Sequence, residues 1–446
     1  MTPTWRRHRA RSACRPVDRF VPRSRARESI SGDGISRRED PVDPSEPVQR
    51  RASDEACAEP EKLWRADRLD VRLRQGRLDP QHLRAVAQAL VRVHAAQPAP
   101  AARAGEASAL ALCERAHALA DRLAAALGDD GALGALRERT TGAIRALGGT
   151  LEQRIAHGRL ALGPADRSLR DVYVDAVGNA LLAAPAGASA PCAADAALAV
   201  SRVGVGLAAA RRRDLAEHFL CAWADAADDY EIYRVLPAFE GLAALGLAVE
   251  ALARDGADAA RSLLAAVATG APAARPRLVA VGGPIASGKS TVATRLAAEI
   301  GAPVLSADAT RDALVARGVA AIDGWSIHLE LTRRAEAVLD SGRSVVLDGG
   351  FRSQAMRRAA ARLARDRGLS FLFTECRARE ATLRRRLAER WERGDFEETF
   401  EDLLSDWEPV RALDGAAHVV IDTTQSAPRG FGRLRRVLPA VRHQVA

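Results

Sequence analysis

The chain has 446 residues, which is enough for two domains with buried cores and additional segments. Hydrophobic residues make up 48% of it but aromatic residues only 4%, and alanine supplies much of the apolar content. This composition favours a helix-rich protein with closely packed small side chains. The net charge of +9 raises the question of an anionic partner, which depends on where the charge lies.

Nearly all of the excess charge lies in the first 27 residues, where nine arginines accompany a single acid, Asp18. A polybasic tail of this kind is able to hold RNA or an anionic membrane. The favoured interpretation of residues 1–50 is instead a disordered Arg-rich extension, or translated sequence upstream of the true start. A nucleic-acid partner therefore stays open as an alternative, and no membrane partner is expected.

Six cysteines are scattered without a C-x-x-C pair or histidines at ligand spacing, which argues against a zinc site or a disulfide framework. No signal-peptide hydrophobic segment follows the N-terminus. The longest uncharged run, 176–194, contains Gly, Pro, Asn and Ser and is unsuited to a membrane-spanning helix. These features predict a cytoplasmic protein, and they leave its oligomeric state open.

Residues 51–268 show apolar residues at helical spacing. Leu83, Val86 and Leu90 illustrate the pattern, which returns over 108–128, 193–210, 212–229 and 236–254. The one strand-like pattern in this half is 170–175. A Pro/Ala-rich linker over 269–276 predicts a domain boundary.

From residue 277 to 446 the pattern changes to short apolar runs separated by helices. The runs are expected to be strands buried on both faces, and their alternation with helices predicts a doubly wound parallel sheet. They lie at 278–281, 303–306, 344–348, 371–376 and 418–422. The expected fold class is α/β, with a C-terminal P-loop NTPase domain preceded by a mostly α-helical domain.

Only two of the 66 basic residues are lysines, Lys62 and Lys289, so a lysine here needs a local reason. Lys289 lies in GGPIASGKST, the pattern G-x-x-x-x-G-K-[ST] of a phosphate-binding loop, between an expected strand and helix. Backbone N–H groups of such a loop surround the β-phosphate, and the ammonium group reaches the β- and γ-phosphates. The planar arginine fork is too large for that place. The sequence therefore predicts an ATP site formed by Gly283, Pro284, Ile285, Ala286, Ser287, Gly288, Lys289, Ser290 and Thr291.

Two carboxylates follow the next two expected strands. Asp348 ends the run VVLD, as the second acidic motif of P-loop NTPases does, and it is expected to hold Mg²⁺ together with the Ser290 hydroxyl. Asp308 has two interpretations. It accepts the proton of an attacking hydroxyl or holds Mg²⁺ through water, or it caps the helix that follows. Arg311, one turn further on, favours the functional interpretation.

Arg386 and Arg390 are four residues apart in ATLRRRLAERWERGD and so share a helix face. On a mobile helix they would stabilise charge on a transferring phosphoryl group. The alternative is a solvated face paired with the interleaved Glu389 and Glu392. The sequence does not decide between the two.

Together these motifs resemble the family of small-molecule P-loop kinases that includes gluconate kinase, chloramphenicol phosphotransferase and zeta-toxin-like kinases, among AAA-family ATP-binding domains. The likeness is greatest to bacterial "predicted kinase" domains and covers roughly 277–425, through GGPIASGKST, SADATR, VVLDGGF, TEC and RLAER. The resemblance implies that Asp308 is the base, Arg311 a substrate contact, and Arg386 and Arg390 lid arginines, catalytic together with Lys289. The segment 311–342 is short for the substrate-recognising helices of this family, so no acceptor is implied.

The helical half resembles an aminoglycoside phosphotransferase-like domain, in which an H-G-D motif supplies a catalytic Asp and a residue five further on binds Mg²⁺. Asp166 and Asp171 match these two positions, but Pro-Ala replaces His-Gly, and ALLAAPAG stands where a second metal Asp should follow. The strands that precede such a C-lobe are missing as well, and Lys62 stands at an apparent helix start. The resemblance therefore implies a degenerate, non-catalytic kinase fold in a fusion protein.

The leading hypothesis is an ATP- and Mg²⁺-dependent phosphotransferase that phosphorylates a hydroxyl of a small molecule. A polynucleotide or tRNA 5′-hydroxyl kinase is an alternative that would use the same site and the Arg-rich tail. A nucleotide-gated binding module with little turnover is another, in which ATP controls the grip of the helical half on a protein partner.

Overall fold

The structure is a computed structural model that describes residues 66–128, 131–163, 167–184, 191–269, 275–389, 407–413, 416–425 and the single positions 432, 434 and 437. The chain divides into two units, Met1–Val48 and Gln49–Ala446, and every described residue belongs to the second. The predicted extension at 1–50, Lys62, Asp166 and Arg390 lie outside the described residues. The predicted boundary at 269–276 stays a prediction.

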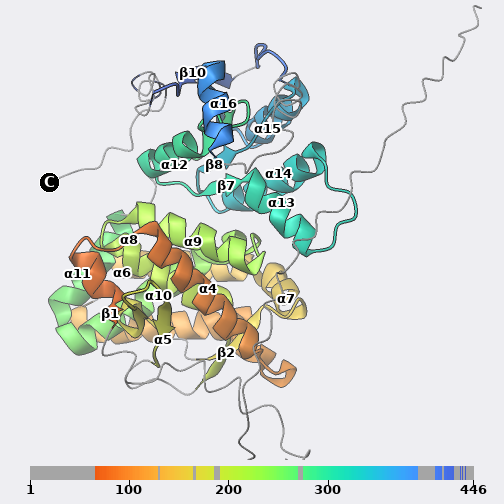
Figure 1. Ribbon diagram of the computed structural model, residues 1–446. Helices are drawn as coiled ribbons and strands as arrows, with labels where there is room; N and C mark the ends of the chain where they lie inside the picture. The colour runs from red at the N-terminus through yellow and green to blue at the C-terminus, as the bar shows by residue number, and fades with distance from the viewer. Residues whose placement is uncertain are drawn as a thin grey trace, which may run out of the picture. The chain divides into compact units, whose positions relative to one another are not determined.

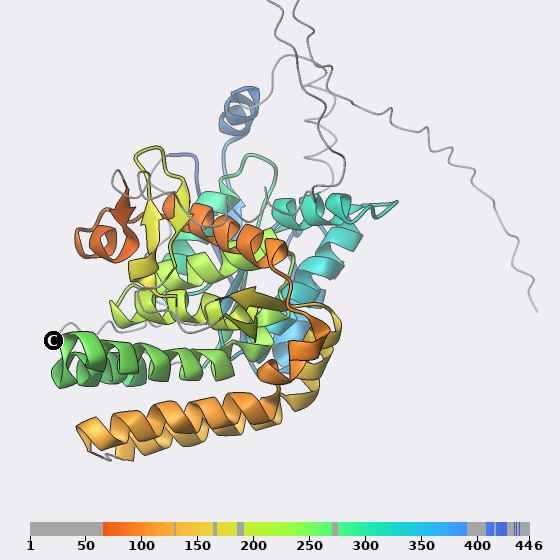
Figure 2. The ribbon, with the colours of Figure 1, turned by 90° about the horizontal axis from the view of Figure 1, so that it is seen from below.

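The first half of the described chain is mostly helical, as predicted. Its helices are α3 (Leu69–Arg74), α4 (Pro80–Ala96), η1 (Ala101–Ala107), α5 (Ala109–Leu127), α6 (Gly131–Ala146), α7 (Gly148–Ala156), η2 (Leu169–Asp171), α8 (Ala196–Ala209), α9 (Arg213–Ala227), α10 (Ile232–Asp255) and α11 (Ala257–Thr269). In Figure 2 the orange helices α5 and α6 lie side by side, and α10 packs against α11 in the same way.

Two small antiparallel sheets accompany these helices. One has the order β1-β3-β4, and the other pairs β2 with β5. The strands are β1 (Asp67–Arg68), β2 (Leu160–Gly163), β3 (Val172–Val174), β4 (Ala180–Leu182) and β5 (Cys192–Asp195). The expectation of a single strand at 170–175 was therefore incomplete. Strands of two to four residues are too short for an alternating pattern to emerge in the sequence.

Helix α10 lies at the centre of the helical half, in contact with α5, α6, α8 and α11. By length and composition it is the one described helix able to cross a membrane, with a mean hydropathy of 1.7 over its most apolar window. However, 72% of that window is buried inside the protein. Packing on all sides accounts for its apolar composition. Arg234 and Glu240 interrupt its sequence, so the helix does not stand out as a long uncharged run.

The second half contains a five-stranded sheet with the order β10-β9-β6-β8-β7, in which every neighbouring pair is parallel (Figure 1). All five predicted strands are confirmed. The elements are β6 (Arg277–Gly282), α12 (Lys289–Ile300), β7 (Val304–Ser306), α13 (Ala307–Ala316), α14 (Gly324–Asp340), β8 (Val345–Asp348), α15 (Gln354–Asp366), β9 (Ser370–Arg377), α16 (Glu380–Ala388) and β10 (Ala416–Asp422).

Alternate residues of the central strand β6 belong to different hydrophobic clusters. Leu278 and Ala280 lie in the cluster that includes residues of α14 and α15, whereas Val279 and Val281 lie in the cluster built with α12. Because successive side chains of a strand point to opposite faces, helices cover both sides of the sheet. The predicted doubly wound α/β fold is therefore confirmed for this half.

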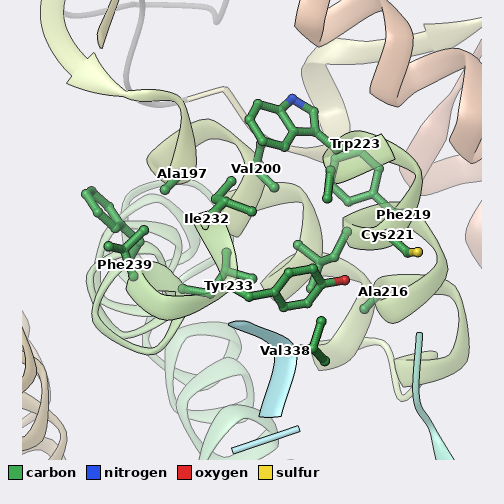
Figure 3. Close-up of a cluster of buried hydrophobic side chains, with 14 of the residues drawn as sticks. Ala197, Val200, Ala216, Phe219, Cys221, Trp223, Ile232, Tyr233, Phe239 and Val338 are labelled. Carbon is green, nitrogen blue, oxygen red and sulfur yellow. The ribbon is translucent and has the colours of Figure 1, made fainter. Parts of the chain in front are cut away.

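Helix α14 also packs against the helical half. In Figure 3 the Val338 side chain of α14 lies beside the ring of Tyr233 on α10, within one continuous hydrophobic cluster. Both residues are completely buried. Helix α14 thus makes apolar contacts with the sheet on one side and with the helical half on the other.

A buried ion-pair cluster joins α14 to the turn between α9 and α10. The Arg334 guanidinium is 1% exposed, lies 2.7 Å from Asp228 and 3.1 Å from Glu330, and covers the Tyr230 ring at 4.8 Å. Asp228 ends α9 in the left-handed region, with φ of 45°. Although burial opposes the shift, hydrogen bonds from neighbouring arginines lower the pKa of Glu330 to about 2. The cluster therefore holds a charged carboxylate at neutral pH.

A second buried pair lies nearby. Arg343, just before β8, is 7% exposed, and its Nε lies 3.1 Å from each carboxylate oxygen of Glu217 on α9. The same guanidinium pairs with Glu240 on α10. Burial raises the pKa of Glu240, against the effect of the arginine charge. Arg334 and Arg343, both in the sheet half, thus form ion pairs with carboxylates of the helical half.

We expect Arg334→Met to lower the free energy of unfolding by about 2 kcal/mol, since it removes the buried charged donor to Asp228 and Glu330, although Arg317 still pairs with both carboxylates. Urea denaturation followed by circular dichroism measures the change. The matched control is Arg254→Met, which removes an exposed pair with Glu250 at 3.9 Å and should cost less than about 1 kcal/mol. Equal effects of the two substitutions would contradict the role of the cluster.

Candidate active site

The predicted phosphate loop connects β6 to α12. Gly288 is the N-cap of α12, with φ of 79°, and no side chain caps this helix end. The N–H groups of the first turn are thus available to an anion. The Lys289 ammonium folds over the loop and donates to the Pro284 carbonyl at 2.8 Å. The strand–loop–helix context required of a P-loop is confirmed.

Gly283 lets the loop approach the end of β9. Its φ is 150°, and a Cβ here would overlap the carbonyl oxygen of Cys376 and lie 2.7 Å from Ser287 Oγ. The Ser287 hydroxyl is itself fully buried and has no hydrogen-bond partner among the described residues. The TEC segment noted in the sequence therefore forms the wall against which the loop packs.

Gly283→Ala should distort the loop, because a methyl group would meet backbone that cannot move independently. Backbone strain of this kind costs on the order of 1–3 kcal/mol, and we expect at least about a tenfold loss of affinity for fluorescent mant-ATP, measured by titration. Gly134→Ala, inside α6 where nothing lies within 4 Å, is the control and should leave the affinity unchanged. Normal binding by the Gly283 variant would refute the close approach.

Strand register brings Asp348 to the loop. Asp348 is paired with Val281 of β6 on one side and with Ser306 of β7 on the other, so three strand ends meet at one edge. Burial raises the pKa of the Asp348 carboxyl, although the hydrogen bond with Ser290 and the charge of Lys289 oppose the shift. The predicted pair Ser290 and Asp348 is thus in direct contact.

The raised pKa of Asp348 has a consequence for stability. Above its folded-state pKa the Asp348 carboxyl is both charged and buried, which lowers the stability of the folded protein. This loss of stability is present at neutral pH, and it disappears below the ordinary Asp pKa, where the carboxyl is protonated in the folded and unfolded states alike. We therefore expect Asp348→Asn to raise the thermal midpoint of the nucleotide-free protein at pH 7.5, with a smaller gain at pH 4. Calorimetry at both pH values measures this. A lower midpoint at pH 7.5 would contradict the assignment.

Residues 278–410 match the family model described as an AAA domain. This segment contains the phosphate loop, Asp308, Asp348 and α16. Two curated relatives are "Uncharacterized protein Mb2027c" of Mycobacterium bovis and "Uncharacterized protein Rv2004c" of Mycobacterium tuberculosis. Each is 36% identical over 135 residues, which is 27% of this chain and 27% of the relative. The chain therefore matches only about a quarter of the length of these relatives.

Three solved structures are similar over 37% of this chain. They are a sugar kinase from Janibacter sp. HTCC2649 (22% identity, TM-score 0.28, 93% of that chain), a putative kinase from Chloroflexus aurantiacus j-10-fl (20%, 0.31, 98%) and a gluconokinase from Sinorhizobium meliloti 1021 (22%, 0.28, 96%). These TM-scores are too low to support an argument, and the fold assignment rests on the strand order and register above.

Asp308 lies in the first turn of α13. The cap of this helix is the Ser306 side chain, which accepts from the N–H groups of Asp308 and Ala309, so the interpretation of Asp308 as the cap is wrong. Ser306 has the extended backbone of an N-cap residue, whereas Asp308 already lies inside the first turn of the helix. The Asp308 side chain is 83% exposed and pairs with Arg311. Asp308 and Arg311, the two residues predicted to act on the substrate, therefore lie in contact.

A cavity of about 180 Å³ opens beside Asp308 and Arg311. It lies between α13, α14 and the loop after β8, and so on the β7 side of the phosphate loop. Its wall is formed by Ala307, Asp308, Arg311, Gly324, Ile327, His328, Leu331, Gly349, Gly350, Phe351, Arg352 and Met356. The segment 311–342, which looked short for substrate-recognising helices, supplies α13 and α14 and hence much of this wall.

Arg386 on α16 reaches the phosphate loop. Its guanidinium donates to the carbonyl oxygens of Ala286 at 3.3 Å and Thr423 at 2.5 Å. The neighbouring Arg385 is the residue that faces Glu389, at 3.9 Å. The solvated-face alternative is therefore wrong for Arg386, because the two residues point in different directions from the helix. Arg390 lies outside the described residues.

Two parts of the site were missed in the sequence. The Thr423 hydroxyl, just after β10, lies 2.6 Å from the Ser287 carbonyl and so fastens the last strand to the phosphate loop. His328 and Arg352 line the cavity. Arg352 follows the VVLDGGF motif directly, which was a usable signal. Nothing in the local sequence marks His328, because only the packing of α14 on the sheet turns it toward the cavity.

In the helical half, Asp171 accepts hydrogen bonds from the N–H and hydroxyl of Ser168, at 2.7 Å and 2.8 Å. These contacts close the short helix η2. The resemblance of this half to aminoglycoside phosphotransferases, and its loss of catalysis, stay predictions.

Proposed function

We propose that the protein is an ATP-dependent phosphotransferase that transfers the γ-phosphoryl group to a hydroxyl of a small molecule bound in the cavity beside Asp308. The observation that carries the proposal is the register Val281–Asp348–Ser306. It brings the phosphate loop, a carboxylate and the cavity to one edge of a parallel sheet, where ligands bind in such folds. The match of 278–410 to an AAA domain supports the nucleotide site.

The residues beside the loop fit a magnesium ion. Ser290 and Asp348 supply a hydroxyl and a carboxylate in mutual contact, and oxygen ligands of this kind suit Mg²⁺. When bound, the metal would neutralise negative charge on the phosphates. Lys289 would hold the β- and γ-phosphates, and the N–H groups at the start of α12 would bind the remaining phosphate oxygens of the nucleotide.

The remaining groups act on the acceptor and on the transferring group. Asp308 would take the proton of the acceptor hydroxyl, and Arg311 orients its carboxylate through their ion pair. Arg386, whose contacts lie on the loop carbonyl of Ala286, would stabilise charge on the phosphoryl group. Arg390 is proposed for the same role on sequence alone. A cytoplasmic location is part of the proposal.

Lys289→Ala should abolish transfer and leave the circular dichroism spectrum unchanged, because the ammonium group supports phosphates and not the core. The assay incubates the full chain with γ-labelled ATP and a cell extract of metabolites and RNA, then measures label transfer. We expect a rate at least about 100-fold lower. The control is Arg295→Ala, on an exposed face of the same helix, with normal transfer expected.

The labelled fraction separates the alternatives. Label in small molecules supports the proposal. Label in RNA that is lost at high salt and on deletion of residues 1–50 would replace it with a polynucleotide 5′-hydroxyl kinase. Tight ATP binding without labelled product would indicate a nucleotide-gated binding module, and unchanged transfer by Lys289→Ala would overturn the site itself.

A further inference from the structure

Arg357 on α15 is a buried cation that no step of the proposed transfer uses. Its side chain is fully buried, and its guanidinium donates five hydrogen bonds, one for each N–H group. The acceptors are the main-chain carbonyl oxygens of Phe351 (2.8 Å), Arg352 (2.8 Å), Glu408 (2.7 Å) and Pro409 (3.3 Å), and the amide oxygen of Gln354 (3.3 Å). The guanidinium therefore ties together the segments that supply these carbonyls.

The first two carbonyls belong to a loop that forms part of the cavity wall. Residues 349–352, between β8 and α15, line the cavity beside Asp308. Within this loop Phe351 has a φ of 47°, in the left-handed region where a residue with a Cβ is strained. Arg357 donates to the carbonyl of Phe351 and to the carbonyl of the next residue. It therefore stabilises the strained loop in the conformation that shapes the cavity.

The same loop also contacts the phosphate loop. The Gly350 carbonyl accepts a hydrogen bond from the Gly283 N–H at 3.3 Å. The phosphate loop is fastened independently by Thr423 and Arg386, which bond to its carbonyls. A shift of residues 349–352 would therefore change the cavity wall directly, and the nucleotide site much less.

The other two carbonyls belong to the segment 407–411, which follows α16 in the chain. The Glu408 N–H donates to the Arg352 carbonyl at 3.0 Å, so this segment pairs directly with the cavity loop. The Trp407 ring covers the Arg357 guanidinium, with its centroid 4.6 Å from Cζ, and this cation–π contact adds to the hydrogen bonds. Arg357 thus lies between the two segments and bonds to both.

We propose that Arg357 is a positioning residue of the phosphotransferase, which joins the loop 349–352 to the segment 407–411 and so fixes the wall of the acceptor cavity. This inference rests on the proposed function. Arg357 acts through main-chain carbonyls and not by contact with the reacting groups. Lysine cannot take its place, because the three N–H groups of an ammonium diverge from a single nitrogen and cannot reach four carbonyls in two segments.

The first test measures transfer by Arg357→Lys, with Arg358→Lys at the neighbouring exposed position of α15 as the matched control. The full chain receives γ-labelled ATP and serial dilutions of the small-molecule fraction of the cell extract. The amount of this fraction that gives half-maximal transfer is its apparent KM. We expect this apparent KM to rise at least about tenfold in Arg357→Lys, while the affinity for mant-ATP changes less than about twofold. Arg358→Lys should change neither quantity.

A purely structural role gives a different result in the same assay. Arg357→Lys would then have a lower thermal midpoint, but its apparent KM would equal that of the natural chain when both are assayed well below that midpoint. This outcome would overturn the inference.

Hydrogen exchange followed by mass spectrometry tests the connection without an acceptor. Peptides that cover 349–353 and 407–411 should exchange at least about tenfold faster in Arg357→Lys, which corresponds to about 1.4 kcal/mol in the free energy of local opening. Peptides from α4, in the helical half, should exchange at the same rate in both proteins. Unchanged exchange in either of the two segments would contradict the proposed connection.

Gln354→Met is a milder second variant for the case that Arg357→Lys does not fold. It keeps the side-chain length and removes the hydrogen bonds of Gln354 with Arg357 at 3.3 Å and with the main chain of Arg411 at 3.4 Å. We expect the apparent KM to rise at least about threefold and the same two segments to exchange faster. No change in either quantity counts against the inference. If the natural chain transfers no label, the proposed function fails, and the exchange result by itself supports or overturns the connection through Arg357.

Discussion

The pairing of β6, β8 and β7 in parallel register is the constraint on which the other features of the site depend. It aligns Val281, Asp348 and Ser306, so that the loop after β6, the acidic end of β8 and the start of α13 emerge together. Alternate residues of β6 and β8 pack into different clusters on the two sides of the sheet, so a shift in register would disrupt close packing on both faces. The hydrogen bond between Ser290 and Asp348 follows from that register.

Helix α14 links the candidate site to the helical half. His328 and Leu331 lie on its cavity side, and Arg334 and Val338 meet the turn after α9 and the helix α10. The cavity wall is thus held from behind by buried charge and by apolar packing. The helical half, whose own chemistry is unassigned, therefore has a structural role in shaping the cavity.

The sequence was most informative where one residue type has few substitutes. The isolated Lys289 and the glycines around it predicted the strand–loop–helix unit, and short runs of Val, Ile and Leu predicted all five strands of the sheet. Asp308 shows where such prediction ends. A carboxylate early in a helix fits a cap or a free group equally well, and only the position of Ser306 in space decided between them. Arg386 is a similar case, because the sequence predicts the helix face on which it lies but not what that face contacts.

By itself the sequence determined the α/β class of the second half, its parallel strands and the position of the phosphate loop, because these follow from local periodicity and from backbone geometry that few residues permit. The tertiary structure alone decided what surrounds the loop. Thr423, His328 and Arg352 come from segments far from Lys289 in the chain, and their roles depend on side-chain packing that has no local pattern. The ion pairs between Arg334 and Asp228 and between Arg343 and Glu217 likewise join residues more than 100 positions apart.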